Sequence, residues 1–238
     1  MKNIKKLQQA ADILFQKYEQ TKDVDGIGMA IMLIHEFIVD NEPVKKGTLS
    51  VWDFVIKSKS EAQLRPAMAC VFHDAEHKSA VGTDAHVMYA NPAEYDEKYA
   101  GKVIDKYGKE AEEHIKYPNW SKVIPQDKDL QTLDIREDLQ DVRDTCKSTM
   151  KLKQDNKNLQ CIVCINKELG VWVNLKYAEL ILQVGADGWK CSKERPKTGA
   201  IVKKWEDGKV LLIMPMMGPE DLDYGTVDKN NMVAFIRK

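Results

Sequence analysis

The order of the apolar segments after residue 130 restricts the fold of this chain more than any other feature. Short β-prone segments are interrupted there by two helical patterns, which begin near residues 136 and 175. The expected strands lie at residues 133–135, 159–165, 170–173, 200–205 and 210–214. Helices placed between runs of antiparallel strands favour an α+β fold, in which the helices pack on one face of antiparallel sheets.

Both helical patterns have one apolar side. In the first helix, apolar residues recur at i+3 and i+4 steps and predict a single buried stripe. The stripe consists of Leu139, Val142, Cys146 and Met150. The second helix has Asn174 as its expected N-cap, and Gly185 and Gly188 mark its end. Its inward-facing residues are Leu175, Ala178, Ile181, Leu182 and Val184.

The first half of the chain mixes helical and β-prone patterns. Residues 4–18 have apolar side chains at helical spacing and predict an amphipathic helix. Residues 29–39 are a continuous apolar stretch, either a buried helix or a strand, and we favour a helix. A turn at residues 73–78 is expected to join two of the next β-prone pieces as a hairpin, and residues 106–114 are compatible with a helix. The β-prone pieces are residues 52–57, 67–73 and 79–90.

Composition limits the classes of function. The 238 residues include 36 Lys and Arg against 37 Asp and Glu, so any contact with DNA has to come from a local basic patch. Five cysteines at irregular spacings and an N-terminus without a signal-peptide pattern indicate the reducing cytoplasm. The most apolar run, residues 27–38, is too short to cross a bilayer, and we expect no membrane partner.

The sequence favours a non-catalytic protein without a metal or cofactor. His73 and His77 have a spacing that serves a metal on a helix, but these residues lie in an expected hairpin turn. Cys161 and Cys164 lie in an expected strand, where residues three apart point to opposite faces, so buried structural thiols are the better interpretation. An unrelated α+β enzyme built on the two histidines is the remaining alternative.

Four segments share their sequence patterns with one known family. Residues 81–88 read Val-Gly-Thr-Asp-Ala-His-Val-Met and residues 117–125 read Tyr-Pro-Asn-Trp-Ser-Lys-Val-Ile-Pro. Residues 171–182 read Val-Trp-Val-Asn-Leu-Lys-Tyr-Ala-Glu-Leu-Ile-Leu and residues 210–217 read Val-Leu-Leu-Ile-Met-Pro-Met-Met. In this order they resemble segments of the bacterial sliding clamp, the beta subunit of DNA polymerase III. The clamp segments are Ala-Thr-Asp-Gly-His-Arg-Leu, the hinge aromatic-Pro-Asp-Tyr-Arg-Arg-Val-Leu-Pro, Phe-Asn-Val-Ser-Tyr-Val-Leu-Asp-Val-Leu and Tyr-Val-Val-Met-Pro-Met-Arg-Leu.

The resemblance covers roughly residues 50–218 and looks like the family's second and third domains. It implies a groove between two modules that captures partner peptides. Carried over by residue, the groove comprises Thr83, Ala85, His86, Val87, Met88, Pro118, Lys122, Val123, Asn174, Tyr177, Leu212, Met214, Pro215, Met216 and Met217. Ala85 replaces the family's Gly, Val87 replaces its Arg, and Met217 with Gly218 replaces the terminal Arg-Leu. The groove is therefore expected to be less cationic than the family's.

The resemblance also divides the chain into expected regions. They are an N-terminal helical segment at residues 1–48, an abbreviated clamp-like module at 49–125, a clamp-like module at 126–218 and a C-terminal extension at 219–238. The extension includes residues 233–237, which are expected to pack near the groove or to occupy it in another copy of the chain. The abbreviated first module distinguishes this chain from a whole clamp.

The resemblance implies a DNA replication or repair accessory protein, a processivity factor that docks a clamp-binding peptide of a DNA polymerase or repair protein. Duplex DNA and a homo-oligomeric ring are further implied partners. The candidate DNA contacts are Arg136, Arg143, Lys147 and Lys151. Because these residues flank the buried stripe while Glu137, Asp141 and Asp144 lie opposite it, an alternative stays open. In that alternative the chain sequesters clamp-binding peptides without encircling DNA.

Overall fold

The computed structural model describes residues 49–238 except 113, 153–158, 220–226, 229–232 and 238. The helical segment expected at residues 1–48 lies outside the described residues. None of the helices in the described part of the chain has the length and the apolar character that a membrane span requires.

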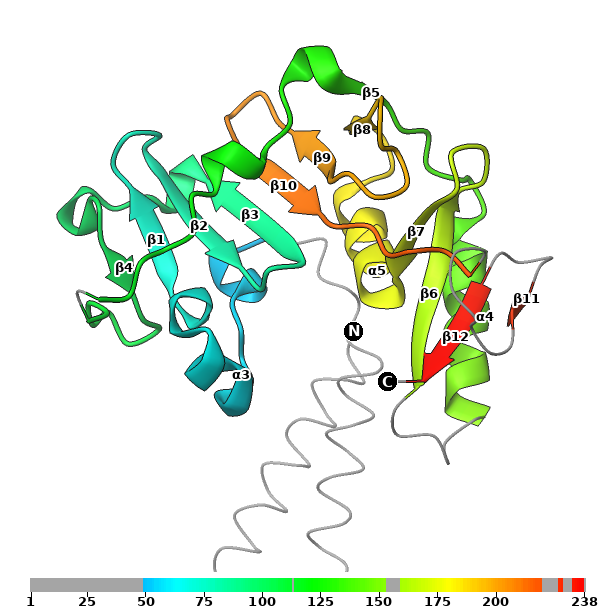
Figure 1. Cartoon of the computed structure of the whole chain (residues 1–238), viewed down its shortest axis with the longest axis horizontal. Helices are drawn as coiled ribbons and strands as arrows, with labels where there is room; N and C mark the ends of the chain where they lie inside the picture. Colours follow the sequence, from blue (N-terminus) through cyan, green and yellow to red (C-terminus); the bar gives the residue numbers. More distant parts are fainter. Residues whose placement is uncertain (1–48, 113, 153–158, 220–226, 229–232, 238) are drawn as a thin grey trace, which may run out of the picture. The chain divides into compact units, whose positions relative to one another are not determined.

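Eight antiparallel strands form the larger of two sheets, in the order β4-β1-β2-β3-β10-β9-β8-β5 (Figure 1). The strands are β1 (Val71–Asp74), β2 (Ser79–Thr83), β3 (Val87–Asn91), β4 (Val103–Ile104), β5 (Leu130–Thr132), β8 (Trp189–Ser192), β9 (Ile201–Lys204) and β10 (Val210–Ile213). At the centre, β3 pairs with β10, with Val87 opposite Ile213 and Ala90 opposite Val210. The sheet is therefore continuous across residues that are far apart in the sequence.

The smaller sheet has the order β11-β12-β6-β7 and is also antiparallel. Its strands are β6 (Leu159–Asn166), β7 (Val171–Asn174), β11 (Val227–Asp228) and β12 (Val233–Arg237). Residues 233–237, for which the sequence left two positions open, form β12 and pair with β6 of the same chain. Val233 and Ala234 are buried there. Neither packing near the groove nor occupancy of the groove in another copy is tested by this pairing, and both stay predictions.

In the described residues, three α-helices accompany the sheets, α3 (Lys59–Leu64), α4 (Leu139–Leu152) and α5 (Leu175–Val184). The expected N-cap of α5 is confirmed, because the side chain of Asn174 accepts a hydrogen bond from the backbone N–H of Lys176 at 3.0 Å. Gly185 follows the helix with φ of 92°, a conformation that favours glycine. The 3₁₀ turns are η1 (Val51–Phe54), η2 (Pro66–Ala69), η3 (Pro92–Glu94), η4 (Glu97–Tyr99), η5 (Ser121–Val123) and η6 (Asp127–Asp129).

The α+β class with antiparallel sheets and helices on one face is confirmed. Leu139, Val142 and Cys146 of α4 are buried as expected, whereas the side chain of Met150 lies outside the described residues. Cys161 and Cys164 are both buried, and they belong to clusters on opposite faces of β6. All five cysteines are buried.

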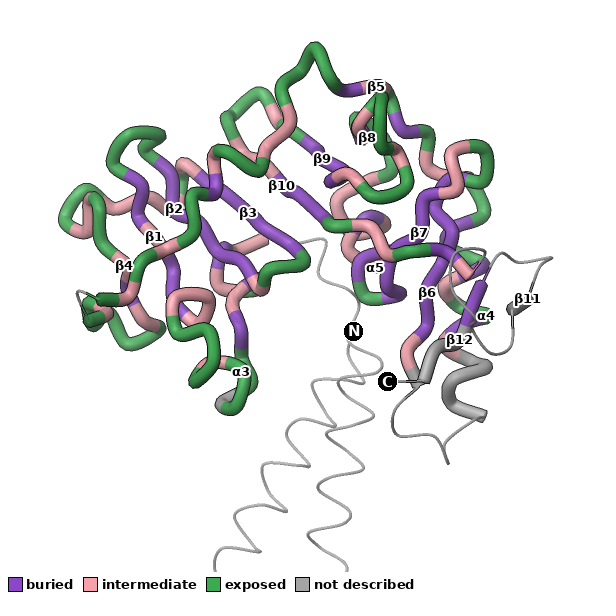
Figure 2. Tube along the Cα trace, in the orientation of Figure 1, coloured by how far each residue is buried: buried purple, intermediate pink, exposed green. Residues whose placement is uncertain are grey.

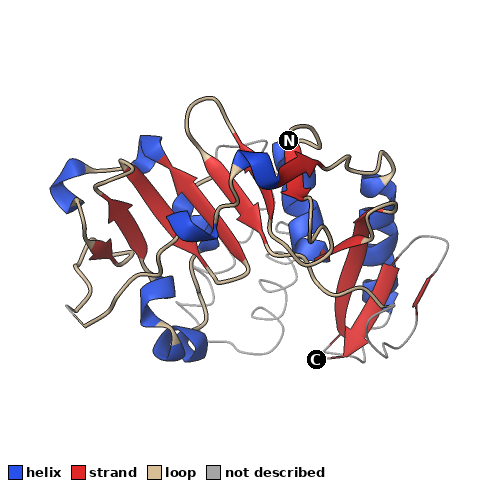
Figure 3. Cartoon of the chain, turned by 45° about the horizontal axis from the view of Figure 1, so that its top comes forward, coloured by secondary structure: helices blue, strands red, loops and turns tan. Residues whose placement is uncertain are grey.

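The two faces of the larger sheet are covered differently (Figures 1 and 2). On the face that we call the helix face, Val87, Tyr89, Leu211 and Ile213 join the largest core cluster, to which α5 and η1 also contribute. On the opposite face, the strap face, Met88, Ala90 and Leu212 pack with Trp120. Trp120 belongs to residues 117–125, which we call the strap, because this segment, green in Figure 1, crosses that face of the sheet (Figures 1 and 3).

Several local expectations were wrong. No strand forms at residues 133–135, because β5 ends at Thr132, and the β-prone piece expected at residues 79–90 is divided into β2 and β3 by a turn. Residues 52–57 do not form a strand, because Ser50 and Asp53 make a reciprocal capping box that starts η1 instead. Residues 106–114 do not form a helix. The Asp105 carboxylate accepts the backbone N–H groups of Tyr107 and Lys109 at 2.8 Å each, and Gly108 adopts φ of 82°, so a tight turn forms.

Candidate peptide-binding groove

The turn between β2 and β3 is built by side chains that bond to their own backbone. Thr83 Oγ1 donates to the carbonyl of Val87 at 2.7 Å and accepts the N–H of Ala85 at 3.1 Å. Asp84 Oδ1 accepts the N–H groups of His86 and Val87, both at 2.9 Å. Ala85 adopts φ of 75°, the left-handed region, where the clamp family has glycine. Thr83 and Asp84 of the Thr-Asp-x-His pattern are thus explained by turn geometry.

The residues that follow β10 lie beside this turn and then reach the smaller sheet. The N–H of Met214 donates to the carbonyl of His86 at 2.8 Å. Two residues later, the N–H of Met216 donates to the carbonyl of Trp172 on β7, also at 2.8 Å. Gly218 lies so close to the indole of Trp172 that an added Cβ would be 2.7 Å from its Nε1. The Met-Pro-Met segment is therefore fixed at both ends.

The start of α5 contributes an ionic contact to the same turn. Lys176 Nζ lies 3.3 Å from Asp84 Oδ2, and the hydroxyl of Tyr177 lies 3.5 Å from the same oxygen. Burial, and next the neighbouring Asp84 carboxylate, raise the pKa of Tyr177 well above its usual range. Tyr177 is therefore a neutral hydrogen-bond donor at physiological pH.

These segments enclose two adjoining pockets. The first, which we call the apolar pocket, has a volume of about 200 Å³ and lies between the strap, the β2–β3 turn and the end of β10. It is lined by Met68, Thr83, Ala85, His86, Val87, Met88, Pro118, Asn119, Trp120, Val123, Leu212 and Met214. Most of these side chains are apolar, so the pocket suits one large apolar side chain of a ligand.

The second pocket, which we call the mixed pocket, has a volume of about 580 Å³ and adjoins the first at His86 and Met214. It combines charged, amide and apolar side chains. Its lining residues are Ile56, Glu61, Leu64, Arg65, Asp84, His86, Gln160, Asn174, Lys176, Tyr177, Met214, Pro215 and Met216. We call the two pockets together the groove.

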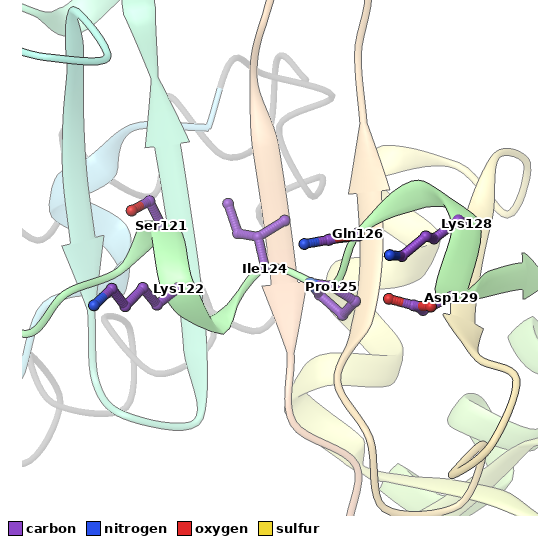
Figure 4. Close-up of a pocket in the computed structure, with 7 residues that line it drawn as sticks. All are labelled: Ser121, Lys122, Ile124, Pro125, Gln126, Lys128 and Asp129. Atoms are coloured by element: carbon purple, nitrogen blue, oxygen red, sulfur yellow. The ribbon is translucent and has the colours of Figure 1, made fainter.

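The groove brings together all of the expected residues except Lys122 and Met217. Lys122 instead lines a separate hollow of about 730 Å³, together with Lys128 and Asp129 (Figure 4). Met217 is 48% exposed and does not line either pocket of the groove. A peptide-binding role for all of the expected groove residues stays a prediction.

Sequence reasoning missed several residues that line the groove. Asp84, Trp120 and Lys176 lie inside the four segments that resemble the clamp family. The same resemblance could therefore have identified them. Leu64, Arg65 and Met68 come from α3 and η2, outside those segments. No pattern in the sequence connected them with a groove.

Exposed apolar side chains gather at the groove. Within the described residues, the exposed large apolar side chains are Leu64, Tyr107, Val123, Met214 and Met217. Leu64, Val123 and Met214 line the groove, and Met217 follows it directly in the chain. Such a concentration of exposed apolar side chains is typical of an interaction surface.

The candidate DNA contacts are held in ion pairs in the structure. The Arg136 side chain is only 6% exposed, and its guanidinium donates to Asp138 and to the carbonyl of Cys164. Arg143 pairs with Asp144 and Lys147 pairs with Glu179. The Lys151 side chain lies outside the described residues. Among the three that the structure describes, Arg136 is therefore the least available to a phosphate.

The two histidines of the metal hypothesis have other partners. His73 Nδ1 accepts the N–H of Asp96 at 3.2 Å, and burial lowers the pKa of His73, which keeps the ring neutral. His77 Nδ1 lies 2.9 Å from Asp74 Oδ2. In the described part of the chain, no group of three or more His, Cys, Asp or Glu side chains is placed to hold a metal ion.

Comparison with known proteins finds similarity only at the level of structure. No protein-family model matches the chain, and a search of curated proteins gives no match. The solved structures to which the chain is similar include bacterial sliding clamps, the family that the four segments resemble.

Three of these clamps illustrate the extent of the similarity. The DNA polymerase III beta subunit of Borrelia burgdorferi, in complex with a natural product, is 12% identical with a TM-score of 0.43, over 69% of this chain and 59% of the clamp. The sliding clamp of Caulobacter crescentus is 13% identical with a TM-score of 0.42, over 70% and 62%. The Helicobacter pylori beta clamp bound to DNA ligase peptide is 14% identical with a TM-score of 0.36, over 76% and 64%. The chain thus spans about three fifths of the length of these clamps.

Proposed function

We propose that the chain is a non-catalytic, clamp-like accessory protein of DNA replication or repair in the cytoplasm, and that it docks a short peptide of a partner protein in the groove. One observation carries the proposal: the exposed side chains of Leu64, Val123 and Met214 line the pockets at which the four clamp-like segments meet. The proposed modules are residues 49–125 and 126–218.

The chemistry of the two pockets indicates how a peptide would bind. The apolar pocket takes one large apolar anchor side chain, and Met68, Met88 and Met214 adapt to its shape because methionine side chains are flexible and polarizable. The mixed pocket has polar groups such as Asn174 and Lys176 that suit an extended backbone and polar side chains. The partner proposed from the sequence resemblance is a DNA polymerase or a repair protein, and the Helicobacter pylori clamp structure contains a DNA ligase peptide.

A titration of the full chain with a fluorescent peptide of the Gln-x-x-Leu-Phe type tests the proposal. We expect saturable binding, and we expect Met214→Ala to weaken it by about tenfold, the change that roughly 1.4 kcal/mol of lost binding free energy produces. Tyr107→Ala is the matched control, because Tyr107 is also exposed and apolar but does not line the groove. Absence of binding, or equal losses in both variants, would contradict peptide docking.

The alternative function is sequestration of clamp-binding peptides without DNA encirclement. The burial of Arg136 in its ion pair with Asp138 favours it, because a processivity factor needs free cations facing the phosphates. Light scattering after size-exclusion chromatography, combined with loading onto circular duplex DNA, separates the two. A ring-sized oligomer that loads on DNA supports processivity, whereas a monomer that binds peptide but not DNA supports sequestration.

A further inference from the structure

The strap carries one wall of the apolar pocket, so whatever fixes the strap also fixes the shape of the pocket. Trp120 is the strap residue that lines the pocket and is also buried against the larger sheet. Its indole Nε1 donates a hydrogen bond of 2.7 Å to Asp74 Oδ2. Asp74 is the last residue of β1 and does not line either pocket of the groove. A buried carboxylate thus reaches Trp120 from outside the groove.

The Asp74 carboxylate is itself held in place. Its Oδ1 accepts the backbone N–H groups of Glu76 at 2.8 Å and His77 at 3.2 Å, which ties it to the turn between β1 and β2. Its Oδ2 accepts His77 Nδ1 at 2.9 Å in addition to the indole of Trp120. The imidazole of His77 also meets the indole edge-on, with ring centroids 5.1 Å apart. Four donors to one carboxylate leave it little freedom to move.

The other contacts of the strap restrict it less at this point. The hydroxyl of Tyr117 donates to the carbonyl of Val81 at 3.0 Å, and the ring of Tyr117 stacks on Phe72. These contacts lie three residues before Trp120 in the chain. A hydrogen bond to a charged acceptor is directional and roughly twice as strong as a neutral one, so it restricts the orientation of the indole beyond what packing does.

We propose that Asp74 is a positioning residue of the groove, which fixes the indole of Trp120 from behind the strap and so sets the shape of the apolar pocket for the partner's anchor side chain. This inference rests on the proposed peptide docking and adds a residue that lies outside the groove. It also gives His77, which the metal hypothesis had singled out together with His73, a part in peptide recognition through its contact with Asp74.

A double-mutant cycle on the full chain tests the inference, with the Gln-x-x-Leu-Phe type peptide as the probe. Asp74→Asn cannot accept from both Trp120 and the turn N–H groups, because one side of an amide donates. Trp120→Phe keeps an aromatic ring but removes the indole N–H. We expect each single variant to weaken peptide binding by about three- to tenfold, the range of one hydrogen bond. We expect the double variant to bind the peptide as tightly as the single variant with the lower affinity, because both substitutions remove the same interaction.

The indole N–H resonances of the ¹⁵N-labelled chain give a second measurement, which a general loss of stability would not reproduce. The Trp120 resonance is assigned by its absence in Trp120→Phe. We expect it to move in Asp74→Asn while the other indole resonances stay in place, and to move in the wild type when peptide is added. Glu97→Gln is the matched control, because Glu97 is an exposed carboxylate of the same module that lies outside the groove.

The outcomes are distinguishable. A wild-type chain that does not bind the peptide overturns the proposed function and the inference with it. A wild-type chain that binds, together with an Asp74→Asn variant that binds as tightly as Glu97→Gln, overturns the inference alone. Additive losses in the double variant also overturn it, because Asp74 would then act independently of Trp120.

Discussion

Under the proposed function, the two faces of the larger sheet divide stability and recognition between them. On the helix face, Leu211 and Ile213 are completely buried in the main core with α5. On the strap face, Leu212 packs with Met88 in a smaller cluster and lines the apolar pocket. Because side chains alternate along a strand, neighbouring residues of β10 serve different purposes. The comparison indicates that a docking surface can be changed on one face while the core on the other face is left intact.

The charged residues of β9 repeat the same division. Lys203 points to the helix face, where its Nζ donates to the carbonyls of Val184 and Gly185, both at 2.9 Å, at the end of α5. Lys204 points to the strap face, where it pairs with the exposed carboxylate of Asp127. A lysine on the helix face is therefore a buried helix cap, whereas its neighbour is a surface ion pair.

The largest expected effect separates Leu211 from Leu212. Leu211→Ala removes a side chain from the main core and is expected to lower the free energy of unfolding by about 3–5 kcal/mol. Leu212→Ala leaves a gap next to an existing pocket and is expected to cost about 2 kcal/mol while also weakening peptide binding. Urea denaturation followed by circular dichroism measures both. Equal losses of stability, or a stronger effect of Leu211→Ala on peptide affinity, would remove the distinction between the faces.

The lysine pair gives the next effect in size. Lys203→Met keeps the aliphatic stem but leaves the carbonyl of Val184 without its donor, and we expect a loss of about 1–2 kcal/mol in the free energy of unfolding. Lys204→Met removes a surface ion pair and should change stability by less than about 1 kcal/mol. Thermal and urea denaturation of the two variants provide the comparison. A larger loss of stability in Lys204→Met than in Lys203→Met would show that the Lys203 cap at the end of α5 contributes little to the free energy of unfolding.

The sequence predicted those elements whose signals are local. The β1–β2 hairpin and α5 are confirmed, because the turn at residues 73–78, the N-cap Asn174 and the terminal Gly185 act through nearby backbone. The strand predicted at residues 52–57 and the helix predicted at residues 106–114 were wrong. In both segments single side chains, above all Asp105, redirect the backbone into turns. Periodicity does not detect a carboxylate that captures two N–H groups.

The candidate site was predictable only where the resemblance reached. Thr83, Trp120 and Met214 lie in segments with clamp-like patterns, and the structure brings these segments together. Leu64, the last residue of α3, and Arg65, which follows it, line the mixed pocket from a segment with no such pattern. Their place in the groove depends on how α3 packs in three dimensions, and composition and spacing carry no information about that.

The pH dependence of stability tests whether the Asp74 carboxylate, which accepts the indole N–H of Trp120, is ionised in the folded chain. Burial raises the pKa of Asp74, but its hydrogen bonds from His77, Trp120 and Glu76 outweigh burial and hold the pKa below the ordinary value of 3.8. A depressed folded-state pKa contributes stability that is present above the unfolded pKa and is lost as the pH falls through the folded pKa. We expect the wild type to be more stable than Asp74→Asn at neutral pH, with the difference shrinking only on acidification below the ordinary pKa. A difference in stability between the wild type and Asp74→Asn that did not change with pH would contradict an ionised Asp74.

The smallest expected effect concerns the β2–β3 turn, and its sign is opposite to the others. Ala85 pays for its left-handed φ of 75°, which costs a residue with a Cβ roughly 1–2 kcal/mol. Ala85→Gly removes this strain, and after the greater freedom of glycine in the unfolded chain we expect a gain of about 0.5–1 kcal/mol. Ala93→Gly is the control, because Ala93 is outside the residues with positive φ and the substitution should destabilise the chain. A higher melting temperature for Ala85→Gly with weaker peptide binding would mean that the strained turn is kept for the shape of the pocket. A lower melting temperature would mean that the Ala85 methyl group, at the rim of the apolar pocket, packs well enough to offset its backbone strain.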